Sequence, residues 1–329
     1  MAPTIFQRHP RYSLFSAVAL LVTFLLLASQ HAPPPPMIID NFTTSAGDLQ
    51  ARLDHAESVY QKMLRQRQGL VKKFGPTPDK VVMFPPDKEP WPPYTVWDFV
   101  PAAFNCPHSV ERIGALGDGG KWVCGLQRVA RKPDCVVYSV GINHESSFEA
   151  ELLSRTTGCE VWGYDFSVSS FGPEIQNDNA LLRRAHFFPY GLAGSDSEGE
   201  HKMFTLATLM ARNGHKHIDI LKVDIESWEF ETLTSLIKPY LESGEPLPFG
   251  QLQLEVHVWN KKFAEFLSWW EMLESAGLRP FWTEPNLVYN NYNKGGDAEL
   301  AEYSFLNIRG ENVFTNDREF FRPRGPSHH

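Results

Sequence analysis

Short apolar runs alternate with amphipathic stretches between residues 135 and 308 of this 329-residue chain. The runs are rich in β-branched and aromatic side chains, which is typical of strands buried in a parallel sheet. We expect strands at residues 135–140, 160–164, 185–192, 217–226 and 251–258, followed by an antiparallel closing pair at 279–289 and 302–308. Helices are expected between the strands, the clearest of them at residues 262–276.

The stretch from Cys135 to Asp165 predicts a strand, a turn, a helix that Ser146 or Ser147 can cap, and a second strand. Gly141 ends the first strand and lets the backbone approach a ligand closely, while Asp165 is placed to accept hydrogen bonds from ribose hydroxyls. The turn lacks the G-x-G-x-x-G pattern that cradles a pyrophosphate. A nucleoside cofactor without pyrophosphate is therefore favoured over NAD, and an ordinary βαβ unit is the alternative interpretation.

Four polar residues stand at the ends of two later strands. Asp224 and Glu226 end one strand, and Glu255 and His257 alternate on one face of the next. All four should face the same crevice as the turn after the first strand. His257 is the best general base by its ordinary pKa, and the carboxylates suit a cation, a base or, if a metal binds, the ligand set Asp224, Glu226 and Glu255. The alternatives are helix-capping carboxylates and a structural histidine.

The N-terminal part predicts a membrane anchor. Arg8 and Arg11 precede an uncharged apolar stretch at residues 13–29, which indicates a signal anchor, with a cleaved signal peptide as the alternative. The positive-inside rule then gives residues 1–12 as a cytosolic tail and puts the rest in a lumen or outside the cell. A proline-rich linker follows at residues 30–45.

Residues 46–74 predict a helix whose apolar positions repeat in four- and three-residue steps, interrupted by Arg67. Two interpretations are open: a coiled-coil stem through which the protein forms a homo-oligomer, or a helix packed on its own domain. A proline-rich arm is expected at residues 75–103, the main domain at 104–316 and a disordered tail at 317–329.

Charge and cysteine content bear on partners and compartment. The formal net charge of −8 argues against nucleic-acid binding. A glycosylation sequon at Asn41 and four cysteines agree with a lumenal location. We expect Cys106 to pair with Cys124, because both flank one predicted hairpin, whereas Cys135 and Cys159 are candidates for simply buried thiols.

These pieces, in this order, resemble class I S-adenosylmethionine-dependent methyltransferases, specifically the FkbM-type group and its eukaryotic methyltransferase-like relatives. The most specific match is Ile218-Asp219-Ile220-Leu221-Lys222-Val223-Asp224-Ile225-Glu226-Ser227-Trp228-Glu229, where the family has D-x-L-K-I-D-x-E-G-x-E. Gly119-Gly120-Lys121-Trp122-Val123-Cys124 and Leu254-Glu255-Val256-His257 also look like the eukaryotic relatives. The resemblance covers roughly residues 104–310, and Ser227 stands where the family usually has glycine.

The resemblance implies an α/β fold, namely a Rossmann-like seven-stranded sheet with helices on both faces, and S-adenosyl-L-methionine as cofactor. The expected cofactor-binding residues are Gly141, Asn143, Ser147, Phe148, Glu149, Asp165, Phe166, Lys121 and Asp224. The expected catalytic residues are His257, Asp224 and Glu226.

The resulting hypothesis is a type II membrane-anchored enzyme of the Golgi or endoplasmic reticulum, or else a secreted one, that methylates a hydroxyl of a glycan or small molecule. A second hypothesis is a catalytically degenerate domain that acts as a lumenal binding or scaffold module. A third is an NAD-dependent oxidoreductase, which the missing glycines disfavour.

Overall fold

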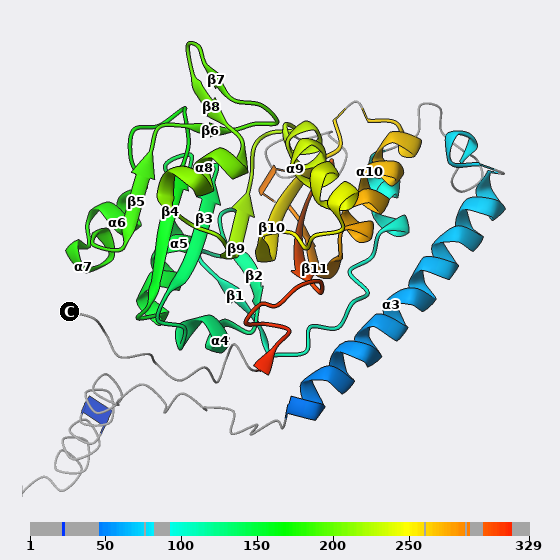
Figure 1. The fold of residues 1–329 in the computed structure, drawn as a ribbon, viewed down its shortest axis with the longest axis horizontal. Helices are drawn as coiled ribbons and strands as arrows, with labels where there is room; N and C mark the ends of the chain where they lie inside the picture. Colours follow the sequence, from blue (N-terminus) through cyan, green and yellow to red (C-terminus); the bar gives the residue numbers. More distant parts are fainter. Residues whose placement is uncertain are drawn as a thin grey trace, which may run out of the picture. The chain divides into compact units, whose positions relative to one another are not determined.

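The computed structural model describes residues 22–23, 46–75, 77–81, 93–259, 261–286, 288–289 and 299–317. The chain divides into two compact units, residues 1–44 and 45–329, of which the first has only residues 22 and 23 described. The second unit is built on a seven-stranded sheet in the order β11-β12-β10-β9-β3-β4-β5 (Figure 1). These strands are β3 (Cys135–Val140), β4 (Cys159–Tyr164), β5 (Ala185–Phe188), β9 (Ile218–Val223), β10 (Phe249–His257), β11 (Leu278–Pro285) and β12 (Leu300–Asn307).

Five of these strands, from β5 to β10, pair in parallel, and β12 runs antiparallel between β10 and β11. The predicted sheet and its antiparallel closing pair are confirmed. The run predicted at residues 185–192 is divided, because Pro189, which has no N–H to donate to a ladder, lies between β5 and β6 (Gly191–Leu192). A small three-stranded sheet joins β6 to β8 (Lys202–Phe204) and β7 (Ser197–Glu198).

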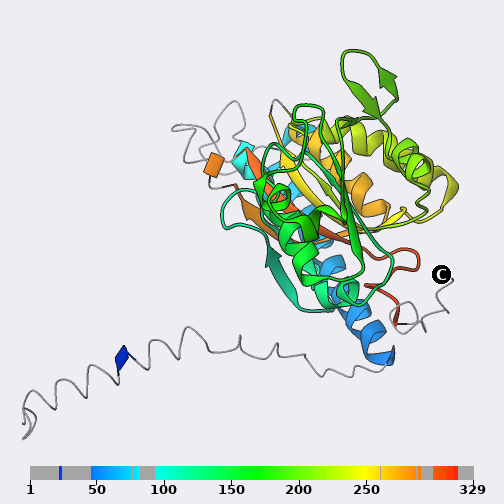
Figure 2. The ribbon, with the colours of Figure 1, turned by 90° about the vertical axis from the view of Figure 1, so that its left-hand side faces the viewer.

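Helices cover both faces of the large sheet (Figures 1 and 2). One face packs against α8 (Leu206–Asn213), α9 (Glu229–Ser243) and α10 (Phe263–Ser275). The other face packs against α4 (Leu126–Ala130), α5 (Ser147–Arg155), α6 (Pro173–Gln176), α7 (Asn179–Leu182) and the hairpin of β1 (Val110–Ile113) and β2 (Lys121–Cys124). Parallel strands buried on both faces are mostly apolar, as these strands are. Among the buried polar exceptions, Lys222 of β9 and Glu255 and His257 of β10 belong to the site described below.

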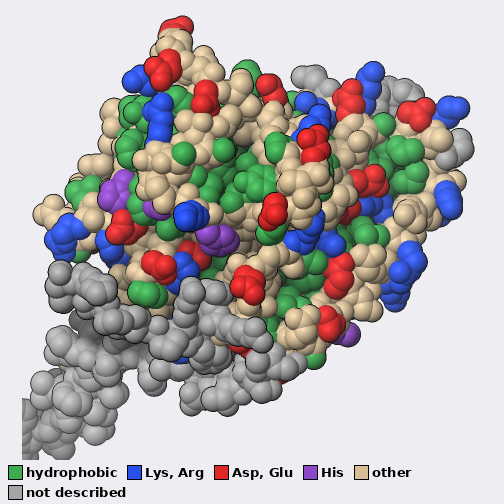
Figure 3. Space-filling view, viewed as in Figure 1, with side chains coloured by type: hydrophobic (Ala, Val, Ile, Leu, Met, Phe, Trp, Pro, Cys, Tyr) green, Lys and Arg blue, Asp and Glu red, His purple; other side chains and the backbone are tan. Residues whose placement is uncertain are grey.

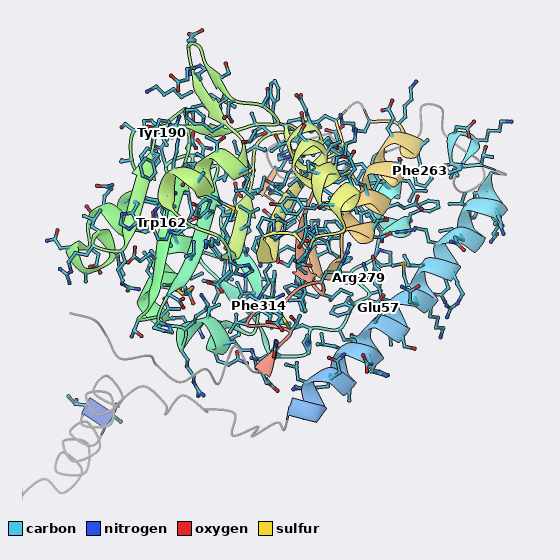
Figure 4. All side chains as sticks on the ribbon, viewed as in Figure 1. Glu57, Trp162, Tyr190, Phe263, Arg279 and Phe314 are labelled. Atoms are coloured by element: carbon cyan, nitrogen blue, oxygen red, sulfur yellow. A yellow bond between two sulfur atoms is a disulfide. The ribbon has the colours of Figure 1, made fainter. Side chains whose placement is uncertain are left out.

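Helix α3 (Ala46–Phe74) lies on its own domain. The predicted stripe is buried there, from Leu49 through Leu53, Ala56 and Tyr60 to Met63. Figure 4 shows Glu57 of α3 and Arg279 of β11 pointing toward one another, and they form an ion pair at 2.8 Å. The structure therefore supports the interpretation of this segment as a helix packed on its own domain.

The arm after α3 contains two short 3-10 helices, η1 (Pro78–Lys80) and η2 (Pro93–Phe99). Trp97 of η2 packs against Phe266 of α10 and Tyr303 of β12, which attaches this part of the arm to the domain. The predicted anchor at residues 13–29 lies outside the described residues except for 22 and 23, as do the sequon at Asn41 and the tail from residue 318. Within the described ranges, no helix combines the length and apolar character that a membrane span requires.

All four cysteines are oxidised. Cys106 bonds to Cys124, as predicted, and ties the chain before β1 to the end of β2. Cys135 bonds to Cys159, so the alternative of two buried thiols is wrong. These two residues are direct partners at the start of the parallel strands β3 and β4, with their Cα atoms 4.2 Å apart. Neighbouring parallel strands bring such residues together although 24 positions separate them in sequence.

Candidate active site

The turn after β3 packs directly on the end of β9. Gly141 has φ +83°, and a Cβ atom there would lie 1.9 Å from the carbonyl oxygen of Asp224. The amide of Asp224 donates to the carbonyl of Val140 at 3.1 Å, which joins the two strand ends. Only glycine combines this backbone conformation with this close approach. The turn predicted to bind the cofactor and the first predicted catalytic carboxylate therefore lie side by side.

Asp165, at the end of β4, braces this turn. Its Oδ2 accepts hydrogen bonds from the amides of Ile142 and Asn143 at 2.8 and 2.9 Å, and its Oδ1 accepts from the amide and hydroxyl of Ser167 at 2.7 and 2.6 Å. Burial alone would raise the pKa of Asp165, but these hydrogen bonds outweigh it and lower the pKa. A ribose hydroxyl that used this carboxylate would replace one of the four bonds.

A buried ion pair supports the turn from within the domain. Lys222 Nζ donates to the carbonyl oxygen of Gly141 at 2.9 Å and lies 3.2 Å from Glu149 Oε1, which also accepts a hydrogen bond from Ser139. The side chains of Lys222 and Glu149 are almost entirely buried. Lys222 was not among the predicted site residues, although it stands two positions before Asp224 and so shares its side of the strand.

Asp224, Glu226 and His257 converge at the carboxyl ends of β9 and β10. One ligand-type atom from each lies within 4.8 Å of the other two. Glu226 and Ser227 both have positive φ, at 52° and 73°, and this turn directs the carboxylate of Glu226 back toward His257. The Nε2 atom of His257 lies 3.5 Å from Glu226 Oε2. The three residues predicted to be catalytic are thus brought together.

Glu229, the first residue of α9, fixes the orientation of His257. Its Oε1 accepts a hydrogen bond from the backbone amide of His257 at 2.7 Å and lies 3.1 Å from the ring Nδ1. Both side chains are buried. With Nδ1–H directed at this carboxylate, Nε2 faces the cluster. Burial alone would lower the pKa of His257, but Glu229, Asp224 and Glu226 outweigh it and raise the pKa.

A second carboxylate group lies beside the first and shares Asp224 with it. Glu255 and Glu302 are direct cross-strand partners on β10 and β12, and Lys121 of β2 forms an ion pair with Glu302. Burial and the neighbouring charges of Asp224 and Glu302 raise the pKa of Glu255 to about 10, so it carries a proton and hydrogen-bonds Asp224. Burial raises the pKa of Asp224, yet Lys121 and this bond bring it below its ordinary value.

Besides Asp165, three of the predicted cofactor contacts are buried side chains. Phe148 has no exposed surface, and its side chain packs in the core beneath the hairpin. Its role as a cofactor contact stays a prediction. Glu149 and Lys121 are buried in the ion pairs described above. Local sequence does not reveal these ion pairs, because the partners Lys222 and Glu302 are distant in sequence.

The remaining predicted contacts lie at the surface of the turn region. Asn143 is exposed, with φ 41°, and Phe166 has 44% of its surface exposed. Ser147 does not cap α5, because its hydroxyl accepts a hydrogen bond from the amide of Ala115 at 2.7 Å. Ser146 is the residue before α5, but its hydroxyl accepts from the amide of Gly172 instead of capping the helix.

The predicted metal-ligand set is divided between the two groups. Glu226 joins Asp224 and His257, whereas Glu255 joins Asp224 and Glu302. Glu302 and Glu229 are not among the predicted site residues. Glu229 lies within the matched motif, three residues after Glu226, and that spacing was the available signal.

The sequence model of a family described as "Methyltransferase domain" matches residues 71–298, which is more than half of the chain. The chain belongs to this family. The match includes the turn at Gly141, the carboxylate of Asp165 and the cluster of Asp224, Glu226 and His257. This confirms the resemblance to methyltransferases on which the expected fold was based.

Two curated proteins are similar to part of the chain. A probable methyltransferase-like protein 24 from Rattus norvegicus is 30% identical over 141 residues, and that from Homo sapiens is 28% identical over 144 residues. The alignments cover 41% and 40% of this chain but only 36% and 35% of the two relatives. The chain therefore matches about a third of their length.

Solved methyltransferase structures are weakly similar. The FkbM methyltransferase from Methylobacillus flagellatus KT aligns with a TM-score of 0.32 and 13% identity, covering 52% of this chain and 44% of that one. A structure described as StiE O-MT residues 961–1257 aligns with a TM-score of 0.32 and 14% identity, covering 59% of this chain and 76% of that one.

Proposed function

We propose that this methyltransferase-family domain transfers a methyl group from S-adenosyl-L-methionine to a hydroxyl of a glycan or small molecule. The observation that carries the proposal is the convergence of Asp224, Glu226 and His257 beside the turn at Gly141. A family cofactor site and a group able to accept a proton thereby share one edge of the sheet.

The residues around the turn fit this cofactor. S-adenosylmethionine carries a positively charged sulfonium and ammonium, and the adjoining group is rich in carboxylates. Phe166 follows Asp165 and offers an exposed ring at the end of β4, where a nucleoside would lie. The missing pyrophosphate cradle, which argues against NAD, is no obstacle to a cofactor without pyrophosphate.

The cofactor supplies an activated methyl group, and the chain aligns the acceptor with it and takes up the acceptor's proton. Nε2 of His257 is the atom placed for proton transfer, because Glu229 occupies Nδ1. Trp228, 61% exposed and two residues after Glu226, offers an apolar surface on which the acceptor can rest.

The two disulfides support a location in the secretory pathway, since such bonds persist in oxidising compartments. The apolar stretch at residues 13–29 and the sequon at Asn41 support the same location and a type II orientation. On the face drawn in Figure 3, the described acidic and basic side chains are interspersed, which fits a neutral acceptor better than a nucleic acid. A homo-oligomer would have to use another face than the buried stripe of α3.

Calorimetric titration of the full chain with S-adenosylhomocysteine tests the proposal. We expect saturable binding that is at least about tenfold weaker in Asp165→Ala, because that variant releases the braced turn at residues 142–143. Asp134→Ala is the matched control, because this exposed aspartate precedes β3 at the opposite end of the strand. Absence of binding by folded protein would refute the methyltransferase proposal and favour the scaffold hypothesis.

A further inference from the structure

We infer that Asp224, Glu226 and His257 form a binding site for a divalent transition-metal ion, with Mn²⁺ and Zn²⁺ as the ions whose ligand preferences fit best. The three ligand-type atoms, two carboxylate oxygens and one imidazole nitrogen, lie within 4.8 Å of one another. Ligands bound at about 2.1 Å in an octahedral shell stand about 3–4 Å apart, so small side-chain adjustments would close this group around one ion. Mixed oxygen and nitrogen ligands suit Mn²⁺ and Zn²⁺ better than Ca²⁺.

His257 gives the second, independent observation. Its side chain is 2% exposed, and from the residues that the structure describes no hydrogen bond reaches Nε2. That nitrogen instead faces Glu226 Oε2 at 3.5 Å and Glu255 Oε2 at 3.7 Å. With the ring proton directed at Glu229, Nε2 faces these two carboxyl groups, and either a proton or a metal ion can bind between them.

Glu229 is the partner that a metal-bound histidine ordinarily has. Histidine ligands commonly donate their other ring N–H to a carboxylate, which fixes the tautomer and strengthens the nitrogen as a ligand. Glu229 Oε1 provides this partner at 3.1 Å, while its Oε2 is buried with no hydrogen-bond partner among the described residues. A cation bound at Nε2 would make the Nδ1–H group more positive and so strengthen its hydrogen bond to the carboxylate of Glu229.

The neighbouring group of Asp224, Glu255 and Glu302 is the weaker candidate, because the chain already supplies its cation. Lys121 pairs with Glu302 there, and both side chains are largely buried. The carboxylate of Glu226, in contrast, is 69% exposed and can be reached by an ion from solvent. Access from solvent and the charges of the neighbouring side chains both favour the group of Asp224, Glu226 and His257 as the metal site.

The role of the ion rests on the proposed function, although its binding does not. An ion held by three protein atoms keeps open positions, and an acceptor hydroxyl bound at one of them becomes more acidic. The hydroxyl's O–H bond breaks, its proton passes to water, and the oxygen's electron pair forms the bond to the methyl carbon as the cofactor's sulfur leaves with the old bonding pair. Without the ion, Nε2 itself is free to take the proton.

The test is titration of the chelator-treated full chain with Mn²⁺, followed by the electron paramagnetic resonance signal of the free ion. We expect one ion per chain, affinity at least about tenfold lower in Glu226→Gln, and a nitrogen coupling to the bound ion that disappears in His257→Gln. Asp118→Asn is the matched control and should bind within twofold of the wild type, because this exposed carboxylate stands near Glu226 but outside the group. Glu226 is exposed, so its variant should fold.

No binding by the wild type, unchanged affinity in Glu226→Gln, or bound Mn²⁺ without nitrogen coupling would each overturn the assignment. The last two results would place the ion elsewhere, for example between Glu255 and Glu302. Titration with S-adenosylhomocysteine in the absence of metal runs alongside. Cofactor binding without ion binding refutes only the metal site, and ion binding without cofactor binding refutes only the proposed function.

Discussion

Single residues at this site are held by partners far from them in the chain. His257 is oriented by Glu229, 28 positions away, and both are buried at the junction of β10 and α9. Ser227 has φ 73°, a conformation in which glycine carries no penalty, and this explains why the related motif has glycine there. The turn retains its direction with serine because the neighbouring strands and helix fix both of its ends.

Replacing Glu229 by glutamine should lower the pKa of His257. The carboxylate raises this pKa through its hydrogen bond and its charge, and the amide keeps the shape but removes the charge. The variant should lose about 1.5–3 kcal/mol of unfolding free energy, the value of a hydrogen bond to a charged group. Nuclear magnetic resonance titration of the imidazole, together with urea unfolding, measures both effects.

The loss of stability should depend on pH with a defined sign. The folded-state pKa of His257 is raised, so the stabilisation it gives is complete below the unfolded pKa of about 6.5 and disappears as pH rises through the folded value. The difference between wild type and Glu229→Gln should therefore be largest in acid. Glu231→Gln, an exposed change in the same helix turn, should leave the pKa and the stability unchanged. A difference that grows with pH would contradict the assignment.

At the scale of elements, helix α3 is attached to the domain by one buried ion pair as well as by its apolar stripe. Arg67 donates two hydrogen bonds to Glu274 of α10, at 2.9 and 2.5 Å. Tyr60 and Trp270 donate to the same carboxylate. The residue that interrupts the apolar pattern of α3 is thus its most specific contact.

Arg67→Met should destabilise the chain by about 3 kcal/mol, because it leaves the buried carboxylate of Glu274 without its counter-charge. Arg65→Met, an exposed change on the same helix, should cost less than about 0.5 kcal/mol. Guanidinium unfolding of the full chain measures the two free energies. Equal stability of the two variants would show that α3 does not dock through this pair.

The approximate positions of the strands and the antiparallel closing pair could be predicted, because they depend on local pattern. Runs such as Cys135–Val140 are almost entirely apolar, and the positions of Asp224 and His257 at the carboxyl ends of strands follow from strand periodicity. The pairings that decide which polar residues are buried could not be predicted. Lys121 meets Glu302 across 181 positions, a contact that no local spacing encodes.

The burial of Phe148 was missed for a related reason. A helix of nine residues has one face toward the sheet and one toward the ligand edge, and the pattern alone does not say how that helix is rotated. The hairpin of β1 and β2 covers this position, because a Cβ on Gly114 would touch the backbone of Phe148 at 2.9 Å. Packing against the hairpin of β1 and β2 therefore determines that Phe148 of α5 is buried.

At the scale of the whole molecule, the two disulfides and the sequon at Asn41 make one joint prediction about compartment. If the domain faces the lumen, Asn41 meets the glycosylation machinery and all four cysteines are oxidised. The full chain expressed in animal cells should then lose apparent mass on treatment with peptide N-glycosidase, and Thr43→Ala should abolish that shift. Thr43→Ser is the matched control, because serine preserves the sequon.

Thiol alkylation of the unreduced, unfolded protein should label no cysteine. An unshifted wild type with alkylated cysteines would place the domain in a reducing compartment, because disulfides do not persist there and N-glycans are not added there.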